Sequence, residues 1–537
     1  MGVYLNGTKP FALYKEIMDS PYFVDKTSIL TELLSSIDQA SKYICITRPR
    51  RFGKTVMANM IGAFLSKGKD SRCLFDGLSI AADGKYEENI NQYNVIYISF
   101  NEVPSNCRTY EQYIGRIQQR LMRDLKRAYP QCGISDTDAV WDVLNDIYEF
   151  ENETRFIFIF DEWDFIFHRD FVTESDKKEY VLFLSNLLKD KPYVSLAYMT
   201  GILPIAKYSS GSELNMFLEY TMTSEERFGQ YFGFTENEVD VLYQQYLKNV
   251  QDVKVTREGL KDWYDGYHTM AGERLYNPRS VVAALTNNNL GNYWTSSGPY
   301  DEIFYYIEKN VAEVRDDLAL MTSGEAVSAR IHEYAATSAN LQTKDEIFSA
   351  MCVYGFLSYE DGKVSIPNRE LMNQFAVMMR KESSLGYVYR LAQASDRMLD
   401  ATLAGDTDTM TEILSYAHDT EVPLKNYSDE TELSAIVNLV YLSARDKYDI
   451  QREDKAGIGY VDFVFYPKNR NDECIILELK VNHSPDDAIR QIKDRQYALR
   501  FHGKLGEERI YTGRILAVGI SYDKKTKKHM CKIEYLD

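Results

Sequence analysis

The chain has 537 residues, of which 45% are hydrophobic and 26% charged, and its formal net charge is −18. This length exceeds one compact core, and the absence of an apolar run of about 18 residues argues against a membrane-spanning protein. Seven cysteines without a C-x-x-C pair argue against a zinc site or a disulfide framework, and together with an N-terminus that lacks a signal-peptide core they predict a cytoplasmic protein.

Four short apolar runs, YICIT, VIYISF, FIFIF and VSLAYMT, alternate with helical stretches in the first part of the chain. Such alternation is typical of a parallel β-sheet covered by helices. The sequence therefore predicts an α/β domain over residues 1–234.

The segment RPRRFGKT, Arg48–Thr55, follows the first of these runs and departs from the usual phosphate-binding pattern at its start. That pattern begins with glycine, whereas this segment has Arg48 there. Its second half is intact, because Gly53 lets the backbone approach a phosphate, Lys54 reaches the β- and γ-phosphates, and Thr55 binds Mg²⁺. The nucleotide-binding residues expected here are Arg50, Arg51, Phe52, Gly53, Lys54, Thr55 and Val56.

The run FIFIF ends at Asp161 and Glu162, a pair typical of a Walker B strand. There the Asp holds Mg²⁺ through water and the Glu orients the attacking water. A buried strand that ends in an acidic turn shows the same pattern without function, but a phosphate loop and this strand in one chain favour a nucleotide site. The run VSLAYMT ends at Thr200, which either senses the γ-phosphate or begins an ordinary turn.

The sequence pattern predicts that the middle of the chain is mainly helical. Thr235 and Glu238 have the spacing of a capping box and predict a helical lid over residues 235–340. A helix followed by two short strands around Asp361-Gly362 predicts a winged-helix-like segment over 341–371, whose acidic tip favours packing over DNA binding. A helical connector is expected over 372–420.

The sequence predicts a second α/β domain over the last part of the chain, residues 421–537. Its expected strands are YVDFVFYP, ECIILELKV, ILAVGISYD and CKIEYL, and a helix is expected to begin near Ser484. Strand periodicity places Glu478 and Lys480 on one face, and pairing of the first two strands brings Asp462 beside them. Two carboxylates and the carbonyl oxygen of Leu479 suit Mg²⁺, and the lysine positions or activates a water that attacks a phosphodiester.

Two features of this last part have plainer explanations. A Glu-x-Lys pair is frequent on solvent-facing strands. Residues 480–537 carry 13 Lys or Arg and 8 Asp or Glu, a net charge of +5, which leaves −23 for the rest of the chain. The basic end permits nucleic acid at one end of the molecule only, but its lysine-rich DKKTKKH is equally explained as a solvated hairpin tip.

The segments YFVDKTSILTELL, RPRRFGKT, FDEWD, TGILPIAKYSSGSELNMF, YFGFTENEV and WYDGY with LYNPRS together resemble a bacterial AAA-ATPase-like family whose members carry a C-terminal PD-(D/E)xK nuclease domain. The resemblance covers nearly the whole chain. It implies a P-loop NTPase parallel sheet of AAA-like type, a helical and winged-helix-like middle, and a C-terminal restriction-endonuclease-like α/β domain. In that family RPRRFGKT is the usual form of the phosphate loop.

The resemblance also implies further nuclease residues. Gln491 and Tyr497 match the arrangement of the helix that follows the nuclease strands, and Glu432 corresponds to an acidic residue of the preceding helix that helps to hold the metal. Tyr460 departs from relatives that often have a basic residue at that position.

The predicted function is an ATPase that gates or positions a Mg²⁺-dependent nuclease on nucleic acid, with DNA favoured, in a setting such as defence or mobile-element maintenance. ATP and Mg²⁺ are the expected cofactors, no membrane is involved, and a homo-oligomer is compatible with the sequence. Arg227 and Arg279 are candidates for a nucleotide-contacting arginine or for structural ion pairs. The expected catalytic residues are Glu162, Asp462, Glu478, Lys480 and Gln491, and the expected metal ligands are Thr55, Asp161, Glu432, Asp462, Glu478 and Leu479.

Two other functions stay open from the residues. One is a nucleotide-dependent switch whose nuclease-like domain binds nucleic acid or a partner without cutting. The other is a structural nucleotide site without turnover, which Glu162 disfavours.

Overall fold

Two compact units make up the chain. The computed structural model describes residues 2–135, 137–205, 212–222, 227–294, 301–331, 341–419, 430–456, 459–501 and 511–536. Unit 1 comprises Met1–Ser297, Arg330–Leu341 and Phe348–Gly362, and unit 2 comprises Gly298–Ala329, Gln342–Ile347 and Lys363–Asp537. The five-part division expected from the sequence stays a prediction.

A five-stranded parallel sheet forms the centre of unit 1. Its order is β2 (Asn94–Ser99), β3 (Phe156–Asp161), β4 (Val194–Gly201), β1 (Tyr43–Thr47) and β5 (Leu218–Tyr220). The first four of these in chain order are the apolar runs expected from the sequence, and every residue of β1, β3 and β4 is buried. The predicted α/β fold class of this part is confirmed.

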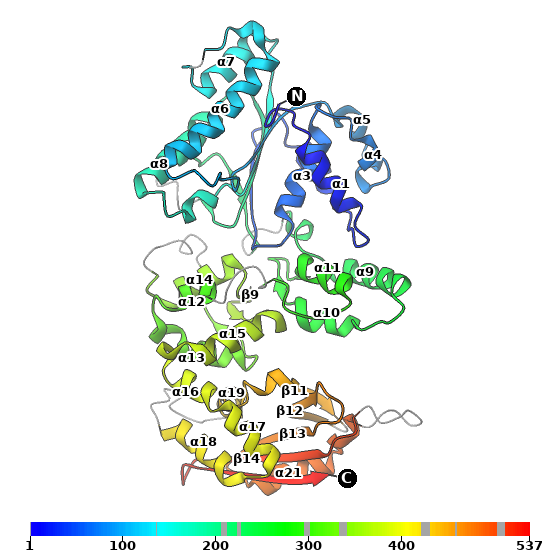
Figure 1. Ribbon diagram of the computed structural model, residues 1–537, viewed down its shortest axis with the longest axis vertical. Coiled ribbons are helices and arrows are strands. Elements are labelled where there is room, and N and C mark those ends of the chain that lie inside the picture. The colour runs from blue at the N-terminus through cyan, green and yellow to red at the C-terminus, as the bar shows by residue number, and fades with distance from the viewer. Residues whose placement is uncertain are drawn as a thin grey trace. The chain divides into compact units, whose positions relative to one another are not determined.

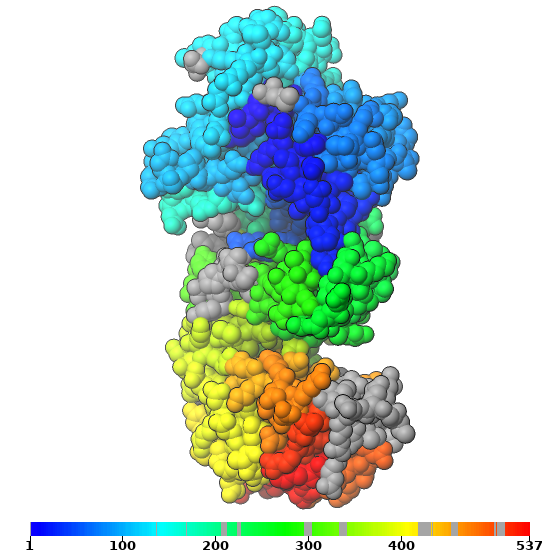
Figure 2. All heavy atoms as spheres, turned by 45° about the vertical axis from the view of Figure 1, so that its right-hand side comes forward, coloured from blue at the N-terminus to red at the C-terminus, as the bar shows by residue number. Residues whose placement is uncertain are grey.

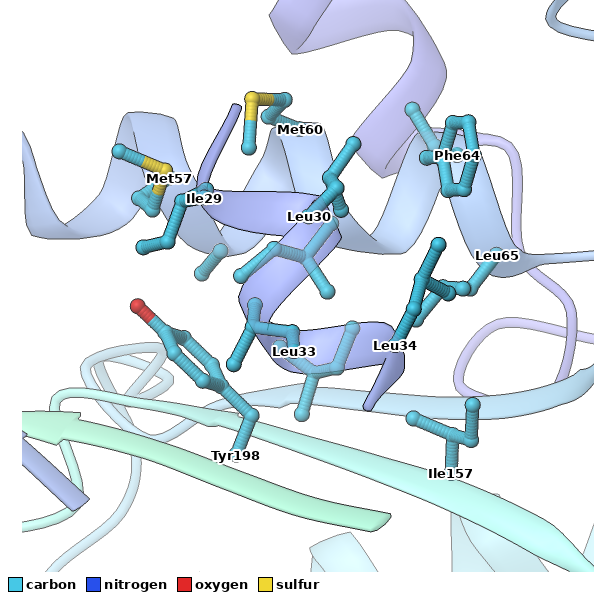
Figure 3. Packing of buried hydrophobic residues seen from close by; sticks show 14 of the residues in the cluster. Ile29, Leu30, Leu33, Leu34, Met57, Met60, Phe64, Leu65, Ile157 and Tyr198 are labelled. Atoms are coloured by element: carbon cyan, nitrogen blue, oxygen red, sulfur yellow. The ribbon is translucent and has the colours of Figure 1, made fainter. Parts of the chain in front are cut away.

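Helices cover both faces of this sheet (Figure 1). One side carries α1 (Lys9–Met18), α3 (Lys54–Leu65), α4 (Arg72–Phe75) and α5 (Tyr86–Asn89), and the other carries α6 (Tyr110–Ala128), α7 (Val140–Phe150) and α8 (Glu174–Leu188). The short helix α2 (Ile29–Leu34) packs its aliphatic side chains against α3 and the sheet. Figure 3 shows this cluster, with Ile29, Leu30, Leu33, Leu34, Met57, Met60, Phe64, Leu65, Ile157 and Tyr198 labelled.

A helical subdomain of unit 1 follows the sheet. It contains α9 (Glu236–Asn249), α10 (Arg257–Tyr264), the two-stranded β6 (Tyr267–His268) and β7 (Arg274–Leu275), and α11 (Pro278–Asn287). Thr235 and Glu238 form the capping box expected at the start of α9. Buried side chains of α9, α10 and α11 form a separate hydrophobic cluster that also includes Tyr22.

The segment expected to be winged-helix-like contains α14 (Lys344–Tyr354), β9 (Ser358–Glu360) and β10 (Lys363–Ser365). Asp361 and Gly362, between the two strands, have φ of 47° and 79°, the left-handed values that a two-residue hairpin turn requires. β10 also pairs in antiparallel fashion with β8 (Val327–Ser328).

Helices make up the rest of the N-terminal half of unit 2. They are α12 (Asp301–Ile307), α13 (Val311–Thr322), α15 (Arg369–Lys381), α16 (Tyr387–Gln393), α17 (Ser395–Ala404), α18 (Thr407–Asp419), α19 (Glu430–Val440) and α20 (Ala444–Lys447). Figure 2 shows the helices near residue 400 (yellow) directly beside the C-terminal strands (red), in agreement with the contact between α18 and the last strand. Across the described part of the chain, no helix has the length and apolarity to cross a membrane.

A mixed five-stranded sheet ends unit 2. It contains β11 (Tyr448–Ala456), β12 (Gly459–Pro467), β13 (Cys474–Val481), β14 (Ile515–Asp523) and β15 (Lys528–Leu536) in sequential order. β13 and β14 run parallel, connected through α21 (Pro485–Asp494), and the other neighbours are antiparallel. The last four strands match the sequence prediction. The edge strand β11 was not predicted, because its YDIQREDKA lacks an apolar alternation.

Candidate active sites

The phosphate loop connects the end of β1 at Thr47 to the start of α3 at Lys54. Gly53 has φ of 87°, and no other atom lies within 4 Å of the position that a Cβ would occupy. The backbone conformation therefore favours glycine here, while the space in front of the loop is open. Arg51 also has a left-handed φ of 70°.

Lys54 is the first residue of α3, at the end of the loop, and its side chain is buried. Its Nζ donates hydrogen bonds to the carbonyl oxygens of Arg48, at 2.7 Å, and Pro49, at 2.8 Å. Burial lowers the pKa of the ammonium group to about 8, against the opposing effect of Asp164, Glu162 and Asp161. The loop thus places a cation where the sequence expects phosphates.

Three predicted residues from three elements meet at Asp161. Its Oδ1 accepts hydrogen bonds from Thr200 Oγ1 at 2.8 Å and from Thr55 Oγ1 at 3.2 Å. Asp161 is fully buried, and burial raises its pKa although these two hydrogen bonds lower it. The hydroxyl and the carboxylate expected to bind Mg²⁺ therefore lie side by side.

Glu162 follows in a strained conformation, with φ of 54°. Its backbone N donates to Thr200 Oγ1 at 3.3 Å. Burial and the neighbouring Asp161 raise the pKa of its carboxyl, while a hydrogen bond with the Asn101 side chain lowers it. The Glu162 side chain is half-buried and follows directly after the end of β3. This position suits a carboxylate that orients a water molecule.

Two residues of this site were missed by the sequence analysis. Asn101, just beyond β2, contacts the Glu162 side chain and accepts a hydrogen bond from Ser99 Oγ at 3.0 Å. Asp164 is buried and accepts backbone hydrogen bonds from Ile202 at 2.9 Å and Leu203 at 2.7 Å, which holds the turn after β4. A polar residue after an apolar strand was the available signal for Asn101.

Arg48, which stands in place of the first glycine, is part of the core. It is 1% exposed, and its Nη1 donates to the carbonyl oxygens of Thr47 at 2.7 Å and Tyr220 at 2.8 Å. Its guanidinium lies 5.2 Å from the centre of the Phe232 ring. Arg48 therefore links β1 to β5 and to the following segment, which a glycine does not do.

Replacement of Arg48 by glycine restores the usual loop pattern but is expected to destabilise unit 1. The change removes two hydrogen bonds from a buried guanidinium and its contact with Phe232, at a cost of about 3 kcal/mol. The midpoint of thermal unfolding should then fall by roughly 5–10 °C, measured by calorimetry. Arg50→Gly, at an exposed position of the same loop, is the control. An unchanged midpoint with tighter ATP binding would refute this account of Arg48.

The remaining predicted nucleotide residues lie around the loop. Arg50 is exposed, while Arg51 and Val56 are half-buried. Phe52 is buried, with its ring 4.9 Å from that of Tyr267 in β6. Phe52 thus attaches the loop to the helical subdomain.

The two candidate arginines differ in their surroundings. Arg227 pairs with Glu32, at 3.1 Å, and donates to the hydroxyl of Tyr220 at 3.1 Å. This pairing agrees with the structural alternative for Arg227. Arg279 is exposed in the first turn of α11.

The second site forms where β12 and β13 lie side by side. Phe463 pairs with Leu477, so the next step of the register brings Asp462 opposite Glu478. Asp462 Oδ2 accepts a hydrogen bond from the Leu479 backbone N at 2.7 Å. Lys480 Nζ lies 3.1 Å from Glu478 Oε1.

The helix α21 completes this second site. It begins with the capping box of Ser484 and Asp487, and its Gln491 donates a hydrogen bond to Glu478 Oε1. Gly519 of β14 pairs with Glu478, and a Cβ there would lie 2.5 Å from the Pro485 carbonyl oxygen. The absent side chain lets α21 approach the strand that carries Glu478.

Three further nuclease predictions have different outcomes. Tyr497 is buried and donates a hydrogen bond to the carbonyl oxygen of Tyr460, whose own side chain is exposed. The Leu479 side chain is buried, as strand alternation predicts. The Glu432 side chain lies outside the described residues, so its predicted metal contact stays a prediction.

Burial sets the electrostatics of Glu478. The residue is 2% exposed, and burial together with Asp462 raises the pKa of its carboxyl to about 7, against the effect of Lys480. Its Oε2 is buried without a hydrogen-bond partner within the described structure. An unpaired buried carboxylate oxygen next to a second carboxylate fits a divalent cation. No group of three or more His, Cys, Asp or Glu side chains suited to a metal occurs among the described residues.

Comparison with known proteins identifies both regions. Residues 10–210 match the family described as Predicted AAA-ATPase, and residues 430–531 match the PD-(D/E)XK nuclease superfamily. The chain therefore joins an AAA-ATPase-like domain to a PD-(D/E)XK nuclease-superfamily domain, which confirms the resemblance seen in the sequence. A search of curated proteins gave no match. The bacterial origin stays a prediction.

Solved structures show only distant likeness. The Walker-type ATPase PABY2304 of Pyrococcus abyssi is 12% identical, with 65% of this chain and 94% of that chain covered and a TM-score of 0.38. The ORC2 protein of Aeropyrum pernix, in ADPNP and ADP complexes, is 12% identical, with 69% and 92% covered and a TM-score of 0.28. At these TM-scores neither protein bears on the activity of this chain.

Proposed function

We propose that this chain, with its AAA-ATPase-like and PD-(D/E)XK nuclease-superfamily domains, hydrolyses ATP and cleaves nucleic acid under the control of ATP. The observation that carries the proposal is that the predicted side chains of each site lie in contact with one another. Asp161 accepts hydrogen bonds from Thr55 and Thr200, and Glu478 contacts both Lys480 and Gln491. The first set suits a nucleotide with Mg²⁺, and the second suits the hydrolysis of a phosphodiester.

In the ATPase-like domain, each proposed role follows from position. The backbone of Gly53 and the ammonium of Lys54 would hold the phosphates, and Thr55 with Asp161 would hold Mg²⁺, which neutralises phosphate charge. Glu162 would orient the attacking water, and Thr200, through its contact with Asp161, would sense the γ-phosphate. An exposed Arg279 is available for a nucleotide contact from the helical subdomain.

In the nuclease-like domain, Asp462 and Glu478 would hold a divalent cation, which supplies charge stabilisation and an activated water. The Leu479 backbone N fixes the Asp462 carboxylate at 2.7 Å, and Gln491 fixes Glu478. Lys480, 3.1 Å from Glu478, would position the water or stabilise charge at the phosphate.

Purified protein incubated with Mg²⁺ and with linear DNA, circular DNA or RNA, each with and without ATP, tests the proposal. Cleavage that disappears in Asp462→Ala supports the nuclease, and cleavage that changes with ATP in the wild type but not in Lys54→Ala supports the control by ATP. ATP hydrolysis without cleavage of DNA or RNA would contradict the nuclease. It would leave a nucleotide-dependent switch whose nuclease-like domain binds without cutting.

The raised pKa of Glu478 makes cation binding dependent on pH. A cation competes with the proton on this carboxyl, so the apparent affinity for a divalent cation should fall by up to about tenfold per pH unit below pH 7 and be nearly constant above it. Titration of catalytically silent Ca²⁺ by calorimetry between pH 5.5 and pH 8.5 measures this directly. Glu478→Gln should remove the pH dependence. An affinity that is constant through pH 7 in the wild type would contradict the assignment.

A further inference from the structure

The lysine-rich hairpin between β14 and β15 is an ordered element of the nuclease-like domain. Asp523 pairs with Lys528, and the Asp523 carboxylate accepts backbone hydrogen bonds from Lys525 at 2.9 Å and Thr526 at 2.7 Å. At its base, the Tyr522 and His529 rings lie 4.8 Å apart. The carboxylate of Asp523, the one acidic side chain in residues 523–528, therefore holds the backbone of the tip in a defined conformation.

The hairpin tip concentrates positive charge on an acidic chain. Residues 523–528 contain four lysines and one aspartate, whereas the whole chain has a net charge of −18. Lys525, Lys527 and Lys528 are exposed. Lys532 of β15 and Lys493 of α21 are instead paired with carboxylates, because Lys532 contacts Asp486 and Glu534, and Lys493 contacts Glu534.

The register of the sheet gives the position of this tip relative to the second candidate site. Lys480 pairs with Ser521, which pairs with Met530, and Lys528 lies two residues along β15 from Met530. Alternation places Lys528 on the same face as Lys480 and Glu478. Ordinary strand spacings put the Cα atoms of Lys480 and Lys528 about 12 Å apart. Lys524 N also donates to Asn482 Oδ1 at 3.1 Å, which ties the tip to the end of β13.

We propose that Lys525, Lys527 and Lys528 form a binding site for the phosphate backbone of nucleic acid that extends from the Asp462–Glu478–Lys480 site. This inference rests on the proposed function for the identity of the substrate. A strand whose phosphate lies at Glu478 reaches the tip within a few nucleotides. Lysine contacts of this kind hold the backbone without reading sequence, and they release counterions from the nucleic acid.

Binding without cleavage is the test. In the Glu478→Gln background, the triple variant Lys525→Ala, Lys527→Ala and Lys528→Ala is titrated into a fluorescein-labelled duplex of about 20 base pairs, as DNA in one arm and RNA in the other. The expected result is a Kd about 10–100-fold higher at low salt, and a slope of log Kd against log salt that is smaller by about 2–3. Arginine at the same three positions should retain binding, because it keeps the charge.

A matched control separates this site from general charge. Lys248, Lys254 and Lys261, exposed lysines of unit 1, are changed to alanine for the same loss of three charges, and this variant should bind like its parent. An unchanged Kd and salt slope in the hairpin variant would overturn the inference, even if the wild type cuts nucleic acid. Lysine-dependent binding by a wild type that cuts nothing would support the inference while contradicting the proposed cleavage.

Discussion

Replacement of Glu478 by glutamine is expected to lower the cleavage rate by about 10³-fold or more while ATP hydrolysis continues. The change removes one of two carboxylates proposed to hold the cation, and the loss of several kcal/mol of transition-state stabilisation corresponds to this factor. Glutamine has nearly the same shape, and its carbonyl oxygen still accepts the hydrogen bond from Gln491. Cleavage of labelled DNA and release of phosphate from ATP are measured on the same preparation.

Stability provides an internal check on this variant. The folded-state pKa of Glu478, about 7, lies above the ordinary value of 4.5, so the folded chain binds this proton more tightly than the unfolded chain. The stabilisation that the folded chain gains from binding this proton is therefore fully present below pH 4.5 and is lost as the pH rises through 7. Glutamine does not titrate, so the free energy of unfolding of Glu478→Gln does not fall in this pH range. At pH 8 the variant should be at least as stable as the wild type.

Glu473→Gln is the matched control for Glu478→Gln. Glu473 lies next to β13 in the same domain and pairs with Arg514 at 2.9 Å, at a partly exposed position. This variant should cleave at the wild-type rate. Undiminished cleavage by Glu478→Gln would place the activity elsewhere than at this site.

Replacement of Glu162 by glutamine is expected to slow ATP hydrolysis by about 10²–10⁴-fold without loss of ATP binding. The phosphate contacts proposed for Gly53, Lys54 and Thr55 stay in place, whereas the group that orients the water loses its charge. Binding is measured with a fluorescent ATP analogue, and hydrolysis by phosphate release. Glu174→Gln, at an exposed side chain paired with Lys177, is the control and should hydrolyse ATP normally.

The same variant separates the effect of ATP binding from that of hydrolysis on the nuclease. If bound ATP alone controls cleavage, Glu162→Gln with ATP should cleave as the wild type does in the presence of a non-hydrolysable analogue. If turnover is required, the variant should cleave as it does without nucleotide. Normal hydrolysis by Glu162→Gln would contradict the role assigned to this residue.

Much of the fold could be predicted from local pattern. The runs that became β1, β3 and β4 are entirely buried, so they appear in the sequence as continuous apolar stretches. The capping boxes at Thr235 and Ser484 were visible because their side chains act within one turn. By contrast, β11 is an edge strand rich in charged residues, and nothing local distinguishes it from a loop.

The residues proposed for both sites were also largely visible, because loop and strand-end chemistry is encoded by short spacings such as Gly53-Lys54-Thr55 and Glu478-Leu479-Lys480. What these spacings could not show was which distant groups meet. The contacts of Thr55 and Thr200 with Asp161, and of Gln491 with Glu478, depend on strand order and helix placement.

The sequence by itself determined that a phosphate loop, an acidic strand end and a Glu-x-Lys strand occur in this chain, since each is a local pattern of residue types. Only the tertiary structure decided the role of Arg48, which pattern comparison treats as a missing glycine. Its guanidinium donates a hydrogen bond to the carbonyl oxygen of Tyr220 and lies near the Phe232 ring. These residues are 172 and 184 positions away in the sequence. Contacts over such separations come from the packing of the sheet, which no short stretch of sequence contains.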